Sequence, residues 1–193
     1  MKHEANLRET VAKIAPLPDD AATRFCAIFS PRKIPNGTDV VEAGSMPKQI
    51  GFVARGLLRS YYISPKGEDV NKHFFTAGSF FAPLTSLVTG APSPVYIGAL
   101  QDSDLLVADY AALLKLYASV PAINTLGRVL VEHAWIGKER RETQLIMLDA
   151  AQRYAAFKRE FSGLEDEIPQ YHIASYLGIT PVQLSRIRRA AKS

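Results

Sequence analysis

The sequence has little of what metal centres, disulfide frameworks and membrane spans require. Its 193 residues include one cysteine and four histidines. A single cysteine cannot form an intramolecular disulfide or hold zinc or an iron–sulfur cluster by itself, and no two histidines have ligand spacing. No stretch approaches the roughly 20 apolar residues that span a bilayer, and the first residues lack the apolar core of a signal peptide. We therefore expect no metal, no cofactor, no membrane partner and a cytoplasmic location.

The elements of catalysis are also lacking. No Ser/His/Asp or Cys/His arrangement and no glycine-rich phosphate-binding loop can be recognised. A metal-dependent enzyme on a cupin-like barrel would need several ligands, but only His73 falls in the strand-rich part of the chain. The sequence therefore predicts no catalytic residues and a protein that is not an enzyme.

Acidic residues are absent from the carboxy-terminal segment. Residues 168–193 contain four Lys or Arg and no Asp or Glu, whereas residues 1–167 contain 19 of each sign. The whole formal net charge of +4 is therefore carried by this last segment. Such a local excess of positive charge is typical of a surface that binds nucleic acid.

The same segment has the pattern of a helix-turn-helix. Ile173, Ala174 and Leu177 share one helical face, and Gly178 ends that helix. Next come an N-cap threonine, a proline at the first helical position and a second helix with its own apolar side, formed by Thr180, Pro181, Leu184 and Ile187. The alternative is a helix pair that only packs, but such a pair needs neither a basic second helix nor the absence of acids.

In the rest of the chain the predicted secondary structure changes twice, from helices to strands and back to helices. Residues 4–30 predict two helices interrupted at Pro16 and Pro18, and residues 32–110 predict short strands between turn residues. Helical texture then returns, and a long helix starts near Pro121. Because no helix-length segments separate the strands, the pattern favours an antiparallel roll over a parallel sheet. The predicted class is therefore α+β, with domains at 1–117 (the roll with its amino-terminal helices), 118–147 (a long dimerisation helix) and 148–193 (the helix-turn-helix).

The long helix carries a broad apolar stripe on its first half. We expect this stripe to contact a second copy of the chain, although packing on the chain's own roll would produce the same pattern. The candidate dimer residues are Ile123, Leu126, Leu130 and Ala134.

A roll, one long helix and a terminal helix-turn-helix together resemble the Crp/Fnr family of bacterial transcription regulators. The resemblance is strongest over residues 173–189, and residues 39–81, with Gly44, Gly51-Phe52-Val53 and Arg55-Gly56-Leu57-Leu58, are similar to the first half of the family's cyclic-nucleotide-binding roll. The family implies a cyclic-nucleotide-binding-like jelly roll and a homodimer joined through the long helix. Two helix-turn-helix heads would then read adjacent major grooves, here with little or no β-hairpin wing after the second helix.

The chain departs from the nucleotide-binding members at two places. Where those members carry a carboxylate for the ribose, residues 80–87 have none, and where an arginine meets the cyclic phosphate, residues 90–95 have none. A buried phosphate without a cation is poorly stabilised, so we do not expect cyclic AMP to bind. The roll then either binds another small-molecule effector or is a structural remnant. The residues of such an effector pocket would be Phe80, Phe81, Leu84, Thr85 and Ser93.

The resemblance places Arg186 at the family's principal base-reading arginine, a side chain that can grip guanine O6 and N7. Pro181 and Val182 replace an arginine and a glutamate that are common in the family. We expect Gln183 to be a polar base reader and Val182 to touch a thymine methyl group. The predicted phosphate contacts are Gln170, Tyr171, Thr180, Arg188 and Arg189. For Arg188 and Arg189 the alternative is a solvated helix end that complements the helix dipole.

The function that follows is a dimeric, sequence-specific, DNA-binding transcription regulator that does not depend on cyclic AMP. Its expected partners are double-stranded DNA, a second copy of the chain, RNA polymerase and an unidentified small-molecule effector. The alternative is an effector-sensing or protein-interaction module whose helix pair binds a protein. Salt distinguishes the two, because DNA binding through phosphates weakens steeply as salt rises.

Overall fold

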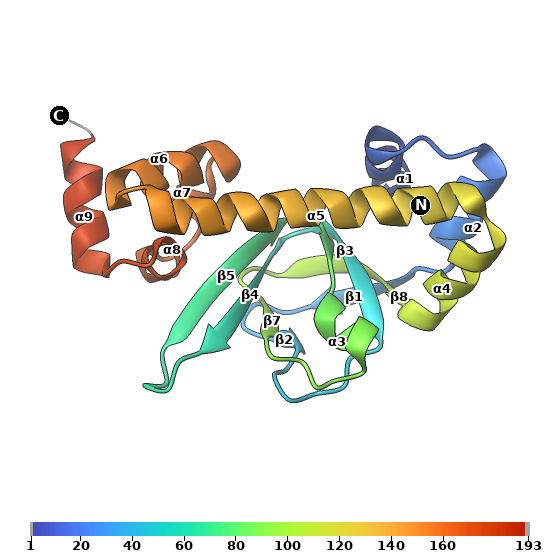
Figure 1. Cartoon of the computed structure of the whole chain (residues 1–193), viewed down its shortest axis with the longest axis horizontal. Coiled ribbons are helices and arrows are strands. Elements are labelled where there is room, and N and C mark those ends of the chain that lie inside the picture. The colour runs from blue at the N-terminus through green and yellow to red at the C-terminus, as the bar shows by residue number, and fades with distance from the viewer. Residues whose placement is uncertain (1, 192–193) are drawn as a thin grey trace. The chain divides into compact units, whose positions relative to one another are not determined.

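A computed structural model describes residues 2–191 (Figure 1). The chain forms two compact units, which are described separately. The first comprises the residues up to Tyr62 together with Phe74–His133, and the second comprises Ile63–His73 and the residues from Ala134 onward. The predicted domain boundaries at residues 117 and 147 stay predictions. The division between the two units falls within the long helix, and the tip of one β-hairpin belongs to the same unit as the carboxy-terminal helices.

The first unit is built on two four-stranded sheets. One sheet has the order β1-β8-β3-β6 and the other has the order β2-β7-β4-β5, and the pairs β1–β8, β3–β6, β3–β8, β2–β7 and β4–β7 are antiparallel. The predicted antiparallel roll is therefore confirmed. The strands are β1 (Ser30–Ile34), β2 (Asp39–Val41), β3 (Gln49–Arg55), β4 (Leu57–Ile63), β5 (Asp69–Thr76), β6 (Phe80–Phe81), β7 (Tyr96–Ala99) and β8 (Ser103–Asp109).

Strands β3 and β8 are buried on both faces and separate two apolar cores. Leu105 and Val107 of β8 point into the core between the sheets, whereas Leu106 and Ala108 point into a second core under the helices. This alternation is the pleat of a β-strand, in which successive side chains leave from opposite faces. A strand with both faces covered has a continuous apolar sequence rather than an alternating one.

Helices cover the outer face of this sheet (Figure 1). They are α1 (Lys2–Ile14), α2 (Asp19–Ala27) and α4 (Tyr110–Ser119), and the short helix α3 (Leu84–Thr89) lies elsewhere in the unit. Leu7 and Val11 of α1 and Phe25 of α2 are buried against Phe52. The two predicted amino-terminal helices are thus confirmed, and the break between them falls at the prolines, where helical hydrogen bonding is interrupted.

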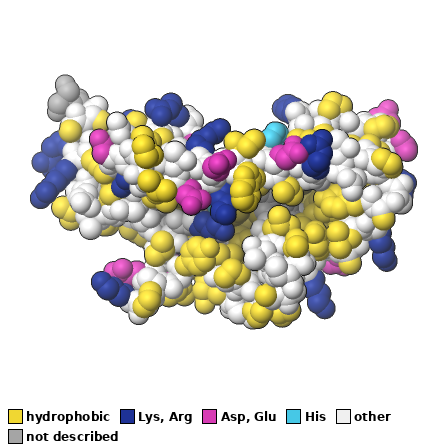
Figure 2. Space-filling model, viewed as in Figure 1, with side chains coloured by type: hydrophobic (Ala, Val, Ile, Leu, Met, Phe, Trp, Pro, Cys, Tyr) yellow, Lys and Arg dark blue, Asp and Glu magenta, His cyan; other side chains and the backbone are white. Residues whose placement is uncertain are grey.

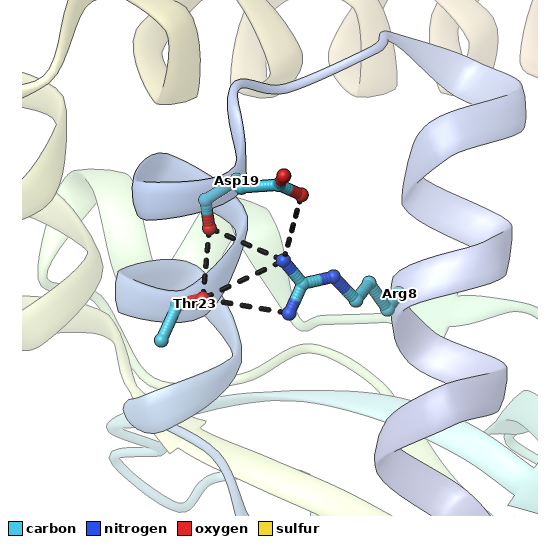
Figure 3. Close-up of polar contacts among 3 residues, drawn as sticks. All are labelled: Arg8, Asp19 and Thr23. Atoms are coloured by element: carbon cyan, nitrogen blue, oxygen red, sulfur yellow. Dashed lines mark hydrogen bonds and ion pairs between the residues drawn. The ribbon is translucent and has the colours of Figure 1, made fainter.

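A polar contact fixes α1 to α2 (Figure 3). The Arg8 guanidinium donates to the side chain and to the backbone carbonyl of Asp19, each at 3.2 Å, and it also reaches the Thr23 hydroxyl. Thr23 in turn donates to the Asp19 carbonyl at 2.8 Å. The cluster is exposed to solvent, so it orients the helix pair and contributes little net stability.

The long helix α5 (Pro121–Met147) begins in the first unit and continues into the second. Its first turns are part of the first unit's core, where Ile123 and Leu126 are fully buried. Residues 131–140 of this helix are all exposed. The two parts of α5 therefore have different roles, the first in packing and the second at the surface.

The second unit contains the carboxy-terminal helices and the tip of the β4–β5 hairpin. Its helices after α5 are α6 (Ala150–Glu160), α7 (Leu164–Glu167), α8 (Gln170–Leu177) and α9 (Pro181–Ala190). Helix α6 starts directly after Asp149, whose side chain accepts from the Gln152 N–H at 2.8 Å in a capping box. Only the single-turn helix α7 had no clear signal in the sequence.

Candidate nucleic-acid interface

Helices α8 and α9 form the predicted helix-turn-helix. Gly178 ends α8 in the left-handed conformation, with φ 68° and ψ 38°, which glycine adopts without a steric penalty. Thr180 is the N-cap of α9, and its hydroxyl accepts from the Gln183 N–H at 3.2 Å. Proline follows at the first helical position, where its missing N–H has no helical partner to lose. The turn is therefore specified by three local signals, which are Gly178, Thr180 and Pro181.

The first helix of the pair, α8, is held by an aromatic core. The rings of Phe157, Phe161 and Tyr176 lie 5.4 to 5.7 Å apart, which is the range of favourable edge and tilted contacts. Ala174 is fully buried, so a small side chain stands on the inward face of α8. Leu184 anchors α9 and is also fully buried.

Two arginines satisfy the last carbonyl groups of α8. Arg153 of α6 donates from Nε to the Leu177 carbonyl at 2.9 Å and from Nη1 to the Leu148 carbonyl at 2.6 Å. Arg141 of α5 donates to the Tyr176 carbonyl and places its guanidinium 4.0 Å from the Tyr176 ring centroid. The terminal carbonyls of a helix have no intrahelical partner and carry partial negative charge. These cations therefore fix the orientation of α8 relative to α5 and α6.

The tip of the β4–β5 hairpin also binds α8. Asn71 is buried, and its side-chain Nδ2 donates to the His172 carbonyl at 3.0 Å and lies 3.2 Å from His172 Nδ1. The Asn71 N–H donates to the Ser175 hydroxyl at 2.9 Å, and that hydroxyl donates to the Asp69 carbonyl at 2.8 Å. His172 and Ser175 therefore form contacts within the second unit, between α8 and the hairpin tip. This contact could not be predicted from local sequence patterns, because the partners are about 100 residues apart.

The outward face of α9 is polar and basic. Leu184 is buried and Ile187 and Arg188 are partly buried, so the opposite side of the helix presents Val182, Arg186 and Arg189. Figure 2 shows Lys and Arg side chains gathered over α9. Helix α9, Pro181–Ala190, has no Asp or Glu. A helix of this kind can enter the major groove and present donors to base edges and phosphates.

The predicted DNA-contacting residues fall into three groups. Arg186, Arg189 and Val182 are exposed on the outward face, and Val182 retains 62% of its accessible surface. Gln183 and Thr180 are exposed, but they bind one another across the start of the helix. Gln170 and Tyr171 are exposed in the first turn of α8, where Tyr171 retains 55% of its surface.

Arg188 differs from its neighbours on α9. It is partly buried, and its positive charge is close enough to Tyr154 of α6 to lower the pKa of that phenol. Burial and a hydrogen bond donated to Glu165 outweigh this effect and raise the pKa of Tyr154 to about 12. The side of α9 that carries Arg188 therefore faces the body of the unit. Ser185, which the sequence reading did not single out, is exposed beside Arg186 and is the better candidate for a contact on that flank.

The expectation for the long helix needs a correction. Ile123 and Leu126 are fully buried in the first unit's own core, and Leu130 packs against that core, so the first two are not available to a second copy. The sequence pattern could not separate these cases, because a core-facing stripe and a dimer-facing stripe have the same spacing. Ala134 is exposed, and near it the exposed large apolar side chains are Val131, Trp135 and Ile136, with Trp135 at 63%.

The five residues suggested for an effector pocket differ in burial and in the groups that they contact. Phe81 lies in the core between the sheets, whereas Phe80 packs against the other core. Leu84 and Thr85 are exposed at the start of α3. Ser93 is buried and bonds within its own loop, donating to the Val95 carbonyl at 2.9 Å.

Within residues 2–191, no group of three or more His, Cys, Asp and Glu side chains could hold a metal ion. Over the same residues, no helix is long and apolar enough to cross a membrane. The one cysteine, Cys26, is buried in the first unit's core, and burial raises the pKa of its thiol. A buried thiol of this kind is held in its unreactive protonated form.

Comparison with known proteins gives a consistent result. Residues 31–120 match the cyclic nucleotide-binding domain family. The chain is 25% identical over 167 residues to the fumarate and nitrate reduction regulatory protein of Vibrio cholerae, a match that covers 81% of this chain and 66% of that protein. The match thus spans just under two thirds of the relative's length.

Two solved structures have the same fold. One is the c-di-GMP-responsive global regulator CLP of Xanthomonas campestris, with a TM-score of 0.71 at 18% identity, covering 91% of this chain and 92% of that one. The other is FixK2 of Bradyrhizobium japonicum, with a TM-score of 0.70 at 17% identity, covering 84% of each chain. The domain match places a cyclic nucleotide-binding domain at residues 31–120, and the chain as a whole has the fold of these two solved structures.

Proposed function

We propose that this protein is a dimeric transcription regulator that binds specific DNA sequences through α8 and α9 and does not respond to cyclic AMP. The observation that carries the proposal is the outward face of α9, where Arg186 and Arg189 stand exposed on a helix without acidic residues. Its opposite side is anchored by the buried Leu184. A generic packing helix has no need of such a face.

In the proposed complex α9 lies in the major groove. Arg186 reads guanine O6 and N7, and Val182, one turn earlier on the same face, contacts a thymine methyl group. Arg189 reaches the phosphate backbone from the far end of the helix. Gln170 and Tyr171 contact a phosphate from the start of α8, where exposed N–H groups and the helix dipole favour an anion. Arg188 is partly buried and stays a predicted phosphate contact at the edge of this face.

Dimerisation is proposed through the exposed part of α5. Val131, Trp135 and Ile136 place three large apolar side chains within six residues, each about half exposed or more. A second copy packed along this helix would remove that surface from water. Two heads related by a two-fold axis would read half-sites about 34 Å apart, one turn of the duplex. Contact with RNA polymerase is part of the same proposal, as expected of a regulator.

Independence from cyclic AMP is supported by the interior of the roll. Phe81 fills part of the core between the sheets, and the segments 80–87 and 90–95 contain no carboxylate and no arginine. An anionic ligand there would lose its hydration without gaining a cation. Another small molecule of lower charge remains compatible with this interior.

The alternative function is an interaction module whose helices bind a protein. The observation that favours it is the exposed apolar end of α5, where Ile146 retains 74% of its surface and Met147 retains 73%. Salt distinguishes the two functions. Binding to DNA through several phosphates weakens steeply between 50 and 200 mM salt, whereas binding through an apolar surface does not.

The test of the proposal is binding to duplexes selected from a random pool, measured with the purified protein across a salt series. We expect a two-fold symmetric motif and a steep loss of affinity with salt. Arg186→Ala should relax the base preference at one position per half-site, at a cost of about 1–3 kcal/mol. If the variant selects the same motif as the parent protein, Arg186 does not read a base.

A further inference from the structure

The side-chain amide oxygen of Gln183 already accepts hydrogen bonds from Thr180. This limits the groups that the Gln183 side chain can offer to DNA. The Thr180 N–H donates to Gln183 Oε1 at 2.9 Å, and the Thr180 hydroxyl lies 3.3 Å from the same oxygen. A backbone N–H can only donate, so the amide atom that faces it must be the oxygen and not the nitrogen. With both contacts made, the part of the amide that remains for DNA is the NH2 group, which has two donors and no acceptor.

The position of Gln183 suits a contact with a base. It is the third residue of α9 and is exposed. The amino-terminal residues of a recognition helix are those that reach base edges. Arg186 follows three residues later and lies beside Gln183 on the helix surface. The two neighbouring side chains therefore both present donors.

Donors select among the four bases in the major groove. Guanine offers two acceptors, N7 and O6, and thymine offers the acceptor O4. Adenine also offers the acceptor N7, but it places an amino group where guanine has O6, and cytosine places an amino group at the corresponding position; an amino group needs an acceptor from the protein. Helix α9 has no Asp or Glu that could supply one, and the Ser185 hydroxyl, which can accept, lies on the other side of Arg186 from Gln183. We therefore propose that Gln183 is a specificity-determining residue that reads a keto base, guanine or thymine, through its amide N–H groups and discriminates against adenine.

The usual pairing of glutamine with adenine is bidentate and uses Oε1 to accept from the adenine amino group. To make it, Gln183 would have to leave Thr180, and the Thr180 N–H at the start of α9 would lose its partner. Such a loss weakens the complex by roughly two- to twelvefold, which reduces the advantage of the bidentate contact. The capping box thus acts on specificity as well as on helix stability. This inference rests on the proposed DNA-binding function.

The test compares the motifs that the full-length protein and Gln183→Glu select from random duplexes. Glutamate can still accept from the Thr180 N–H, because it is a usual capping-box residue, but its carboxylate has no N–H donor. We expect the parent protein to select guanine or thymine at one position per half-site, and the variant to shift that position to cytosine. Replacing the keto base by adenine should weaken binding of the parent protein by about fivefold or more.

The matched control is Gln170→Glu, which makes the same charge change at the exposed start of α8. It should weaken binding to all sequences and leave every base preference unchanged. The inference is overturned if the parent protein prefers adenine or cytosine at the position that Gln183→Glu alters. It is equally overturned if Gln183→Glu alters no position while the preference assigned to Arg186 persists, a result that leaves the DNA-binding function standing. If the parent protein selects no motif, the proposed function fails together with this inference.

Discussion

The orientation of α8 depends on Arg153. Replacing this residue tests which contacts stabilise the carboxy-terminal helices α6–α9, which we call the head. Arg153 donates to the Leu177 carbonyl at the end of α8 and to the Leu148 carbonyl at the end of α5. Arg153→Met keeps most of the side-chain volume and removes both hydrogen bonds. Each charge-assisted bond is worth about 1.5–3 kcal/mol where no water can replace it. Since Arg153 is only partly buried, water can partly solvate the carbonyls, and we expect the free energy of unfolding of the head to fall by about 2–3 kcal/mol.

The assay is urea unfolding of the full-length protein, with hydrogen exchange used to localise the loss. Exchange should become faster in α8 and α9, while the strands β3 and β8 should be unaffected. Arg159→Met is the matched control, because Arg159 is exposed on the same helix and substitutions at such positions usually change stability by less than about 0.5 kcal/mol. A loss for Arg153→Met no larger than for this control would refute the role assigned to the carbonyl contacts.

Three further predictions concern a buried residue of each unit and one histidine. Leu184→Ala should cost about 2–5 kcal/mol and melt the head selectively in hydrogen exchange, because Leu184 is the buried anchor of α9. Gly51→Ala should lower the melting temperature of the roll by overpacking at about 1–3 kcal/mol, since its Cβ would lie 2.1 Å from the Phe81 ring; an unchanged melting curve would show that the ring is free to move. Burial, aided by the charges of Lys72 and Arg141, lowers the pKa of His73 to about 4, below its ordinary value of 6.5. Between these values the unfolded chain binds more protons, so stability should fall as pH drops from about 6.5 to 4, and His73→Gln should flatten that slope in urea titrations at several pH values.

Much of the fold could be predicted from the sequence because its signals are local. Thr180, Pro181 and Gly178 each act on the backbone within one turn, and the prolines between α1 and α2 do the same. The pattern was less informative for β8, whose run of Leu105 to Ala108 is apolar on both faces and has no alternation to distinguish a strand from a buried helix. Strand identity there comes from pairing with β1 and β3, which is not local.

The candidate site was predictable in its residues but not in their roles. The sequence identified Arg186, Val182 and Gln183, but the difference between Arg188 and Arg189 depends on which side of α9 meets α6. Likewise, Ile123 and Leu126 have the spacing of a dimer seam and are instead part of the chain's own core. An apolar stripe shows that a surface is covered, while the covering partner is decided by tertiary packing.

The most direct test of the central claim is selection of bound DNA from a random pool by the purified full-length protein, repeated without cyclic AMP and with it. The account predicts one enriched motif in both conditions, formed by two inverted half-sites whose centres are about one helical turn apart. It also predicts that affinity for this motif falls steeply between 50 and 200 mM salt. The claim would be contradicted by the absence of any enriched sequence, by an enriched sequence that appears only with cyclic AMP, or by binding that is indifferent to salt.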